Sequence, residues 1–143
     1  MSSHFLKDHH WCATLLYNRG FHGMVALNGK LYVAGGSGGG RQLASAECFD
    51  PAANVWEFVA SMHEKRSSLC LVALNDRIFA IGGYSGSNFL SSMEVYNPST
   101  GLWGYGAPLN IQRSEACACV IKGKIYVIGE ATSMTEARKI LVV

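Results

Sequence analysis

The stretch LNDRIFAIGG, residues 74–83, decides the fold, because LNGKLYVAGG stands at residues 27–36 and IKGKIYVIGE at residues 121–130. The three stretches are 47 positions apart (74 − 27 and 121 − 74) and align without a gap. In each, an Asn-Gly, Asn-Asp or Lys-Gly pair separates two short apolar segments, and such pairs tolerate the positive φ of a tight turn. The chain is therefore a tandem repeat in which every repeat opens with a β-hairpin.

Residues outside these stretches recur at the same step. The matches are Arg19 with Arg66 and Arg113, Glu47 with Glu94, Phe49 with Tyr96, Pro51 with Pro98, and Trp56 with Trp103. We expect first strands at 24–27, 71–74 and 119–121, and second strands at 30–34, 77–81 and 124–128. A third strand over 45–49 or 92–96 ends at an Asp-Pro or Asn-Pro turn signal, and a fourth strand carries the tryptophan.

The second strands are apolar at consecutive positions, as in IFAI at residues 78–81, so we expect them to be covered on both faces. Stacked sheets of four short strands, with a period in the forties, are typical of the blades of a β-propeller. We predict eight strands in two four-stranded sheets over residues 22–107, with no helix in the first two repeats. For the third sheet we predict two firmly defined strands.

The repeat resembles the kelch repeat in its paired glycines, its third-strand aromatic residue and its tryptophan. These residues are Gly35, Gly36, Phe49 and Trp56, and then Gly82, Gly83, Tyr96 and Trp103. The resemblance covers residues 19–129 and implies an all-β fold, a partial kelch β-propeller with two complete four-stranded antiparallel blades plus an incomplete third. We divide the chain into an N-terminal flank (1–18), repeat 1 (19–65), repeat 2 (66–112) and a truncated repeat 3 (113–143).

The two ends of the chain depart from the pattern. Repeat 3 departs from the pattern after Ile128, where Gly129 is followed by Glu130, and the register projects residues 139–143 onto its third strand, with Leu141 and Val143 at the positions of Glu94 and Tyr96. At the other end, residues 11–16 are open to two interpretations, because Trp11 lies two positions closer to its arginine than an outer-strand tryptophan should. They are an imperfect outer strand of a preceding blade, or no strand at all. Missing blades leave an apolar sheet face open at each end, so we expect the isolated chain to self-associate or to need partner blades.

The repeated residues have a structural explanation. Glycines without Cβ atoms let neighbouring blades approach closely, and the large aromatic residues fill the space between blades farther out. We expect Glu47 and Glu94 to accept hydrogen bonds within their blades. Arg19, Arg66 and Arg113 are interpreted as holding the blades together, because a residue that is fixed in every repeat suits a structural role.

Composition excludes several classes of protein. Apolar residues make up 49% of the chain and charged residues 15%, which argues against disorder. The net charge is +2 and the basic residues are scattered, so nucleic acid is not an expected partner. The longest apolar runs, 69–74 and 116–121, are far shorter than the ~20 residues of a membrane span. No signal-peptide pattern appears and the five cysteines have no disulfide spacing, so we expect a reduced, cytoplasmic protein.

Individual motifs suggest chemistry that their context does not support. AGGSGGGR at residues 34–41 resembles a phosphate loop, but Arg41-Gln42 stand where Lys-Ser or Lys-Thr is needed. His9, His10 and Cys12 have no second cluster to complete a zinc site. Cys70, Cys117 and Cys119 are interpreted as small buried hydrophobic residues. We expect no metal, no cofactor and no catalytic residues, because no nucleophile, base and orienting group come together.

The resemblance implies a non-catalytic protein–protein interaction module. Kelch-like adaptors pair an N-terminal BTB domain with a kelch propeller that recruits a substrate to a cullin-based ubiquitin ligase. That role is implied for the propeller only, since we expect no BTB region in the residues before residue 11. The alternatives are an actin-binding cytoskeletal kelch protein and, less favoured, a kelch-fold enzyme, for which no Tyr, Cys and His ligand set falls on one face. The sequence does not separate the adaptor from the actin binder.

Partner contacts are expected from two sets of loops, those joining one blade to the next and those joining the second and third strands. Both sets emerge on the same side of a blade, and loops are where binding residues concentrate. The resemblance agrees, and it places contacts two residues after the repeat arginine and just after the diglycine, here Phe21, Ser68, Glu115, Ser37 and Tyr84. Arg41 and Tyr84 are the expected anchors, because Arg and Tyr are enriched among residues that dominate interface energy.

Overall fold

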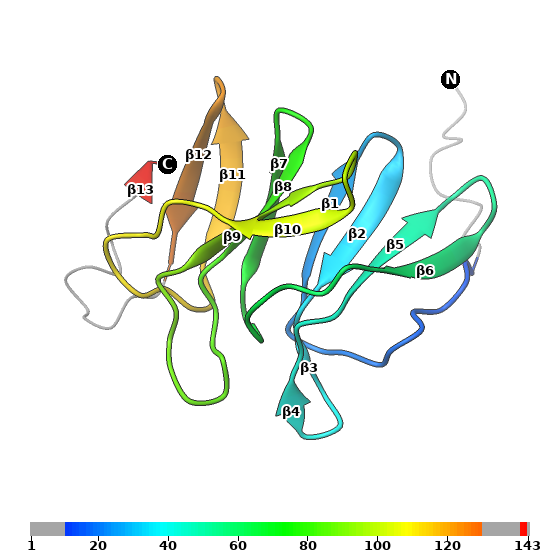
Figure 1. Ribbon diagram of the computed structural model, residues 1–143, viewed down its shortest axis with the longest axis horizontal. Helices are drawn as coiled ribbons and strands as arrows, with labels where there is room; N and C mark the ends of the chain where they lie inside the picture. The colour runs from blue at the N-terminus through cyan, green and yellow to red at the C-terminus, as the bar shows by residue number, and fades with distance from the viewer. Residues whose placement is uncertain (1–10, 130–140, 143) are drawn as a thin grey trace, which may run out of the picture.

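The computed structural model describes residues 11–129 and 141–142, and all regular structure in this part of the chain is β-strand (Figure 1). The first blade contains β1 (Gly23–Leu27), β2 (Lys30–Ala34), β5 (Ala46–Asp50) and β6 (Val55–Val59). The second contains β7 (Cys70–Leu74), β8 (Arg77–Ile81), β9 (Met93–Asn97) and β10 (Leu102–Tyr105). Both are antiparallel sheets in sequence order, which confirms the predicted all-β partial propeller with two complete four-stranded blades.

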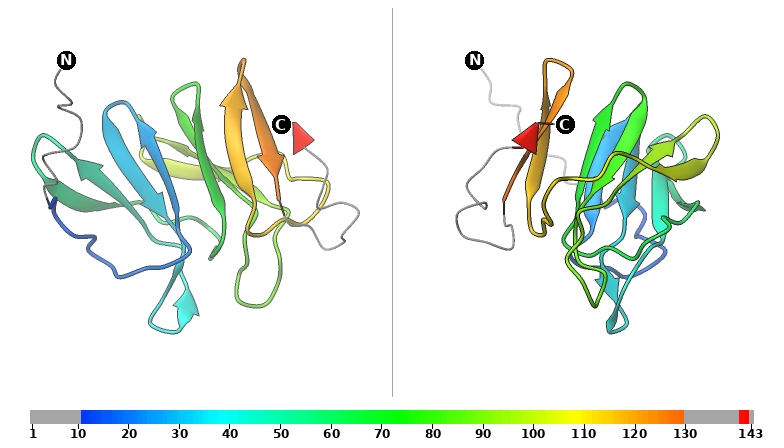
Figure 2. Two further views of the ribbon diagram at one scale, coloured as in Figure 1. Left: turned by 180° about the vertical axis from the view of Figure 1, so that it is seen from behind. Right: turned by 60° about the vertical axis from the view of Figure 1, so that its left-hand side comes forward.

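The hairpin turns have the backbone conformation that their sequences require. Asn28 and Gly29 have φ of 51° and 75°, and Lys122 and Gly123 have φ of 49° and 72°. Positive φ at both central residues matches the right-handed twist of the flanking strands. The hairpins β1–β2, β7–β8 and β11–β12 therefore form alike and stand side by side in Figure 2.

The third sheet has one more strand than predicted. β11 (Cys117–Ile121) and β12 (Lys124–Ile128) form its hairpin, and β13 (Leu141–Val142) adds a short third strand. Val127 pairs with Leu141, as Val33 pairs with Glu47 and Ala80 with Glu94 in the complete blades. The 47-residue register therefore holds across the third blade and places a leucine where the other blades have glutamate. The projected positions 139 and 143 lie outside the described residues.

A small hairpin also corrects the count of eight strands in residues 22–107. β3 (Ser37–Gly38) pairs with β4 (Arg41–Gln42) in a sheet of its own. Its turn residues, Gly39 and Gly40, have φ of 58° and 76°, which is the same turn type as in the large hairpins. The strand prediction missed it because glycine-rich stretches have little β-propensity, and here the turn geometry decides.

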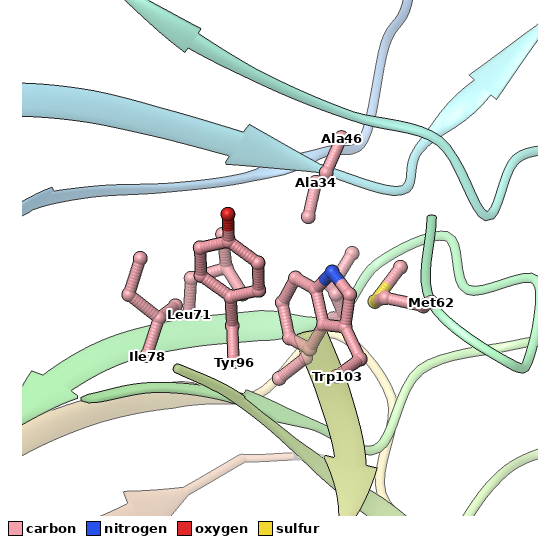
Figure 3. Packing of buried hydrophobic residues seen from close by; sticks show 9 residues of the cluster. Ala34, Ala46, Met62, Leu71, Ile78, Tyr96 and Trp103 are labelled. Atoms are coloured by element: carbon pink, nitrogen blue, oxygen red, sulfur yellow. The ribbon is translucent and has the colours of Figure 1, made fainter. Parts of the chain in front are cut away.

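Successive side chains of each strand point to opposite faces of the sheet, and those on one face pack against the neighbouring blade. In Figure 3, Tyr96 and Trp103 of the second blade point toward Ala34 and Ala46 of the first, and Leu71 and Ile78 lie beside them. The glycines bring the backbones together: a Cβ on Gly35 would stand 2.2 Å from the carbonyl oxygen of Arg66, and one on Gly82 would stand 2.4 Å from that of Arg113. No other residue can occupy these positions without moving the adjacent blade.

Among the described residues, the second strand is covered on both faces most fully in the middle blade. Ile78, Ala80 and Ile81 of β8 are buried, whereas Ile128 of β12 is exposed. Cys70 is buried between blades two and three, but Cys117 and Cys119 are exposed, so the expectation that all three are buried is wrong for these two. The reason is positional, since no described segment covers the side of the third blade that faces away from the second.

The N-terminal flank does not contain a strand in its described part, residues 11–18. Ala13 and Leu15 pack against Phe49 and Trp56, and the Trp56 indole N–H donates a hydrogen bond to the carbonyl oxygen of Ala13 at 2.8 Å. Trp103 makes the same bond to Ala60, 47 residues later, at 2.7 Å. The flank thus runs like the segment that links blades one and two, and the outer-strand interpretation of residues 11–16 has no strand to support it.

Candidate partner-binding face

The expected contact positions lie at the end of the blades opposite the hairpin turns. In Figure 1 the turns of the three hairpins lie along the upper edge, and β3–β4 and the long loop between β8 and β9 lie along the lower edge. The segments linking consecutive blades also pass through this lower end. We call the surface that these loops form the loop face.

Three of the expected positions share an unusual backbone conformation. Phe21, Ser68 and Glu115 have φ of 54°, 51° and 54°, a region that residues other than glycine rarely adopt. The N–H of Ser68 donates to the carbonyl oxygen of Phe21 at 2.8 Å, and the N–H of Glu115 donates to that of Ser68 at 3.0 Å. The strained conformation therefore serves a hydrogen-bonded ladder from blade to blade. Since only the backbone is constrained, the side chain is free to differ in each repeat, here Phe, Ser and Glu.

The side chains at these positions surround a shallow hollow. Its lining residues are Phe21, His22, Ser68, Leu69, Glu115 and Ala116, two from each blade. Phe21 is 72% exposed, so most of its ring is open to a ligand in this hollow. The hollow brings one apolar, one hydroxyl and one acidic group from three blades within reach of a single ligand.

The two positions after the diglycine are equivalent in backbone pairing. Ser37 forms an antiparallel bridge with Gly20, and Tyr84 forms one with Ser67. The Tyr84 ring lies 5.2 Å from that of Phe89, and its hydroxyl donates to the carbonyl oxygen of Gly86 at 2.8 Å. These contacts hold the ring of Tyr84 in place at the surface, which lowers the entropy that it would lose on binding a partner.

Arg41 lies on β4 beside a second hollow. Its lining residues are Tyr17, Arg41, Gln42, Leu43, Ala44, Ser45, Phe58 and Lys65. Sequence reasoning identified Arg41 but missed Lys65, Tyr17 and Phe58. A signal for Lys65 was available, because the position before the repeat arginine differs in each repeat (Asn18, Lys65, Gln112) while the arginine is constant.

Buried ion pairs fasten the linking segments to the blades. The Arg66 guanidinium donates to the carbonyl oxygens of Gly82 and Ser92, at 2.9 and 3.0 Å, and lies 3.1 Å from the carboxylate of Glu94. Glu94 also accepts the backbone N–H groups of His63 and Glu64, at 2.6 and 3.2 Å. Arg19 and Glu47 repeat the pair in the first blade at 2.6 Å, and both side chains are fully buried. The buried arginines and glutamates thus hold in place the linking segments that form part of the loop face.

The charge on Glu94 is maintained by these contacts. Burial opposes its ionisation, but the hydrogen bonds from the backbone and ring of His63 and from the N–H of Glu64 outweigh burial and lower the pKa of Glu94. Burial has the opposite result at Cys70, where it raises the pKa of the thiol to about 12 and keeps the thiol neutral. The described residues contain no group of three His, Cys, Asp or Glu side chains that could hold a metal; His9 and His10 lie outside them.

Within residues 11–129 and 141–142, no helix is long and apolar enough to cross a membrane.

Comparison with known proteins adds independent observations. The family model described as "Kelch motif" matches residues 18–63 and 65–110, which together make up more than half of the chain. Both matches begin one residue before a repeat arginine. Kelch-like protein 35 of Mus musculus is 43% identical over 56 residues, which are 39% of this chain and 10% of that protein. The matched segment thus spans about a tenth of the length of this relative.

Proposed function

Because the chain belongs to the kelch-repeat family, we propose that its loop face binds a partner protein and that the chain itself performs no catalysis. The observation that carries this proposal is the backbone ladder through Phe21, Ser68 and Glu115. It fixes three strained positions in space while their side chains differ, which suits a surface whose framework is constant and whose specificity varies. Strain of this kind is characteristic of functional sites.

The partner is expected to present an acidic group beside an apolar one. Arg41 and Lys65 form no ion pair with any described residue, in contrast to Arg19 and Arg66. The hollow between them also has apolar walls, formed by Leu43, Ala44 and Phe58. A carboxylate of the partner would therefore meet two uncompensated positive charges, and the adjacent apolar side chain would have a surface to bury.

A finer proposal concerns the pathway. We propose the role of substrate-recognition propeller in a cullin-based ubiquitin ligase, acting in the cytoplasm, with actin binding as the alternative. The similarity to Kelch-like protein 35 supports a kelch-like adaptor. The BTB domain of such an adaptor is proposed for the whole protein and not for the kelch repeats themselves. Co-purification of a cullin with the natural protein supports the adaptor role, whereas co-sedimentation with actin filaments, without a cullin, would favour the alternative.

Replacing both anchors is expected to abolish partner capture without unfolding the protein. In the double variant Arg41→Ala/Tyr84→Ala, we expect partner affinity to fall at least about 100-fold, since each anchor contributes on the order of 1.4 kcal/mol or more. The melting temperature should stay within about 2 °C, because both changes are at the surface. Quantitative mass spectrometry of proteins bound to the immobilised chain measures the first quantity and thermal unfolding the second.

Matched controls lie at the opposite end of the blades. Arg77 follows a hairpin turn, and Leu102, which is 65% exposed, begins β10 at that end. The double variant Arg77→Ala/Leu102→Ala should retain every partner. Retention of all partners by Arg41→Ala/Tyr84→Ala would show that the loop face is not the site.

A further inference from the structure

The hollow beside Arg41 differs in charge from the corresponding place in the second blade, although the repeat step relates the two residue by residue. Arg41 and Lys65 line this hollow, and 47 positions later stand Asn88 and Gln112. Neither cation forms an ion pair with a described residue. The first blade therefore has two uncompensated positive charges here, where the second blade has neutral amides.

In the second blade, a carboxylate of the chain itself occupies this place. Glu64 stands 47 positions after Tyr17, another residue that lines the hollow, and it lies 2.7 Å from the Arg66 guanidinium. Glu64 also accepts a hydrogen bond from the hydroxyl of Ser92. The Ser92 oxygen in turn accepts a hydrogen bond from Arg66 at 2.8 Å, so this serine both donates and accepts.

The first blade has no carboxylate at the equivalent position. Tyr17 stands there, and its ring packs against the β3–β4 hairpin, where a Cβ on Gly38 would lie 2.9 Å from the Tyr17 Cε1. The centre of this ring is 5.9 Å from the guanidinium carbon of Arg19. Among the described residues, Arg19 pairs with one carboxylate, that of Glu47, whereas its counterpart in the second blade pairs with two. The tyrosine thus supplies a wall of the hollow and no negative charge.

Ser45 is left with an unused hydrogen-bond donor at this hollow. It is one of the lining residues, and its hydroxyl oxygen accepts a hydrogen bond from Arg19 at 3.1 Å, as Ser92 does from its own arginine. A serine hydroxyl can also donate one hydrogen bond. No described residue accepts from the Ser45 hydroxyl, whereas Glu64 accepts from Ser92. The first blade therefore lacks the acceptor that the second blade supplies from its own chain.

We propose that this hollow binds a glutamate side chain of a partner protein, whose carboxylate takes the place that the Glu64 carboxylate has in the second blade. The carboxylate accepts the O–H of Ser45, and the positive charges of Arg41 and Lys65 compensate its charge. The apolar side chains that line the hollow contact the two methylene groups of the glutamate. That a partner protein supplies the glutamate rests on the function proposed above, whereas the preference of the hollow for a carboxylate does not.

The test is ligand-observed saturation-transfer NMR with N-acetyl-glutamate N-methylamide, a probe whose single charge is its side-chain carboxylate. This measurement tolerates association of the 143-residue chain, because the signal is that of the small probe. We expect saturable binding with a Kd on the order of 1 mM, as is usual for a ligand of this size. The glutamine counterpart of the probe, which has the same shape without the charge, should bind at least about 10-fold more weakly.

A variant can fill the hollow from within. Tyr17→Glu gives the first blade the carboxylate that the second blade already has, so we expect it to abolish saturable binding of the probe. Tyr17→Gln has an amide in place of that carboxylate and should bind the probe at least about 10-fold more tightly than Tyr17→Glu does. Val55→Glu adds the same charge at an exposed position of β6, at the opposite end of the blade, and should bind the probe as the unmodified chain does.

Three results would overturn the proposal: no saturable binding to the unmodified chain, equal binding of the two probes, or equal binding by Tyr17→Glu and Tyr17→Gln. Inorganic phosphate at the concentration of the probe should displace less than half of it, and stronger displacement would indicate an anion site without preference for a carboxylate. Far-UV circular dichroism establishes that the variants are folded. If Tyr17→Glu fails to fold, the exposed double variant Arg41→Ala/Lys65→Ala gives the answer. It should weaken binding at least about 10-fold, and undiminished binding would contradict the proposal.

The glutamate site and the partner-binding function can fail separately. Saturable binding of the probe, together with retention of every partner by Arg41→Ala/Tyr84→Ala, would support the glutamate site and contradict the function. Loss of partners in that variant, with no binding of the probe to the unmodified chain, would contradict the glutamate site alone.

Discussion

Gly82→Val is expected to abolish cooperative folding of the chain. The backbone at Gly82 has a φ of 61°, which costs a β-branched residue on the order of 1–3 kcal/mol. The new Cβ would stand 2.4 Å from the Arg113 carbonyl oxygen, which already accepts a hydrogen bond from the N–H of Gly83 at 2.8 Å. Since this oxygen cannot move without breaking that bond, we expect a total loss of about 4 kcal/mol or more, exceptional for one substitution. Loss of a cooperative transition in thermal circular dichroism measures it.

Substitutions at two other glycines separate the steric cost of a new side chain from the cost of the positive φ. Gly101 has a φ of 70° but open space around its Cβ position, so Gly101→Ala should cost only about 1 kcal/mol. Gly104, in β10, has open space and a backbone conformation that any residue adopts, so Gly104→Val should leave the melting temperature nearly unchanged. If Gly82→Val melts like Gly104→Val, the close approach of the second and third blades is not as described.

Arg66→Met is expected to destabilise the chain by about 3–5 kcal/mol, because it leaves the buried carboxylate of Glu94 without its cation. The change also removes the donors to the Gly82 and Ser92 carbonyl oxygens. Urea unfolding followed by circular dichroism measures the free energy, at one protein concentration because association would shift it.

The matched control is an exposed ion pair in the same fold. Lys30 lies 3.2 Å from Asp50, and both side chains are well exposed, so solvent screens the pair and Lys30→Ala should leave the stability nearly unchanged. The double variant Arg66→Met/Glu94→Leu should recover only part of the loss, since leucine cannot accept the N–H groups of His63 and Glu64. An Arg66→Met variant as stable as Lys30→Ala would rule out a structural role for the repeated arginine.

The fold was largely predictable from the sequence because its determinants are local and recur. Turn pairs such as Asn28-Gly29 define the hairpins, and the repeat step then fixes strand order and even the pairing of Val127 with Leu141. The β3–β4 hairpin was not predictable from strand propensity, since it consists of two pairs of residues joined by a Gly-Gly turn. Exposure of Cys117 and Cys119 was missed because burial depends on a neighbouring blade, which a strand's own sequence does not show.

The location of the candidate site could be predicted from the sequence, but the chemical character of its lining residues could not. Repeat arithmetic puts Phe21, Ser68 and Glu115 at equivalent positions, and the structure brings them together around one hollow. The second hollow joins Tyr17, Arg41, Phe58 and Lys65 from four separate segments. Such a grouping depends on where β4 folds over the segment that links the blades. No spacing rule within one repeat could have revealed it.

The division between a buried framework and the proposed loop face would allow one fold to bind different partners. Buried residues such as Arg66 and Glu94 hold the linking segments in place, and the backbone ladder constrains only the main chain at Phe21, Ser68 and Glu115. We therefore expect that substitution of a side chain on the proposed loop face changes recognition at little cost in stability, whereas substitution of a framework residue changes stability first.

Site-specific photo-crosslinking in cells tests most directly whether the loop face binds a protein. A benzoylphenylalanine in place of Phe21 enlarges an aromatic ring that is already 72% exposed, and one in place of Ser99 lies in the turn before β10, at the opposite end of the blade. We predict that irradiation links position 21 to a discrete partner protein and that position 99 gives no such adduct. Equal adducts at both positions, or adducts at position 99 alone, would contradict the assignment of the loop face as the partner-binding surface.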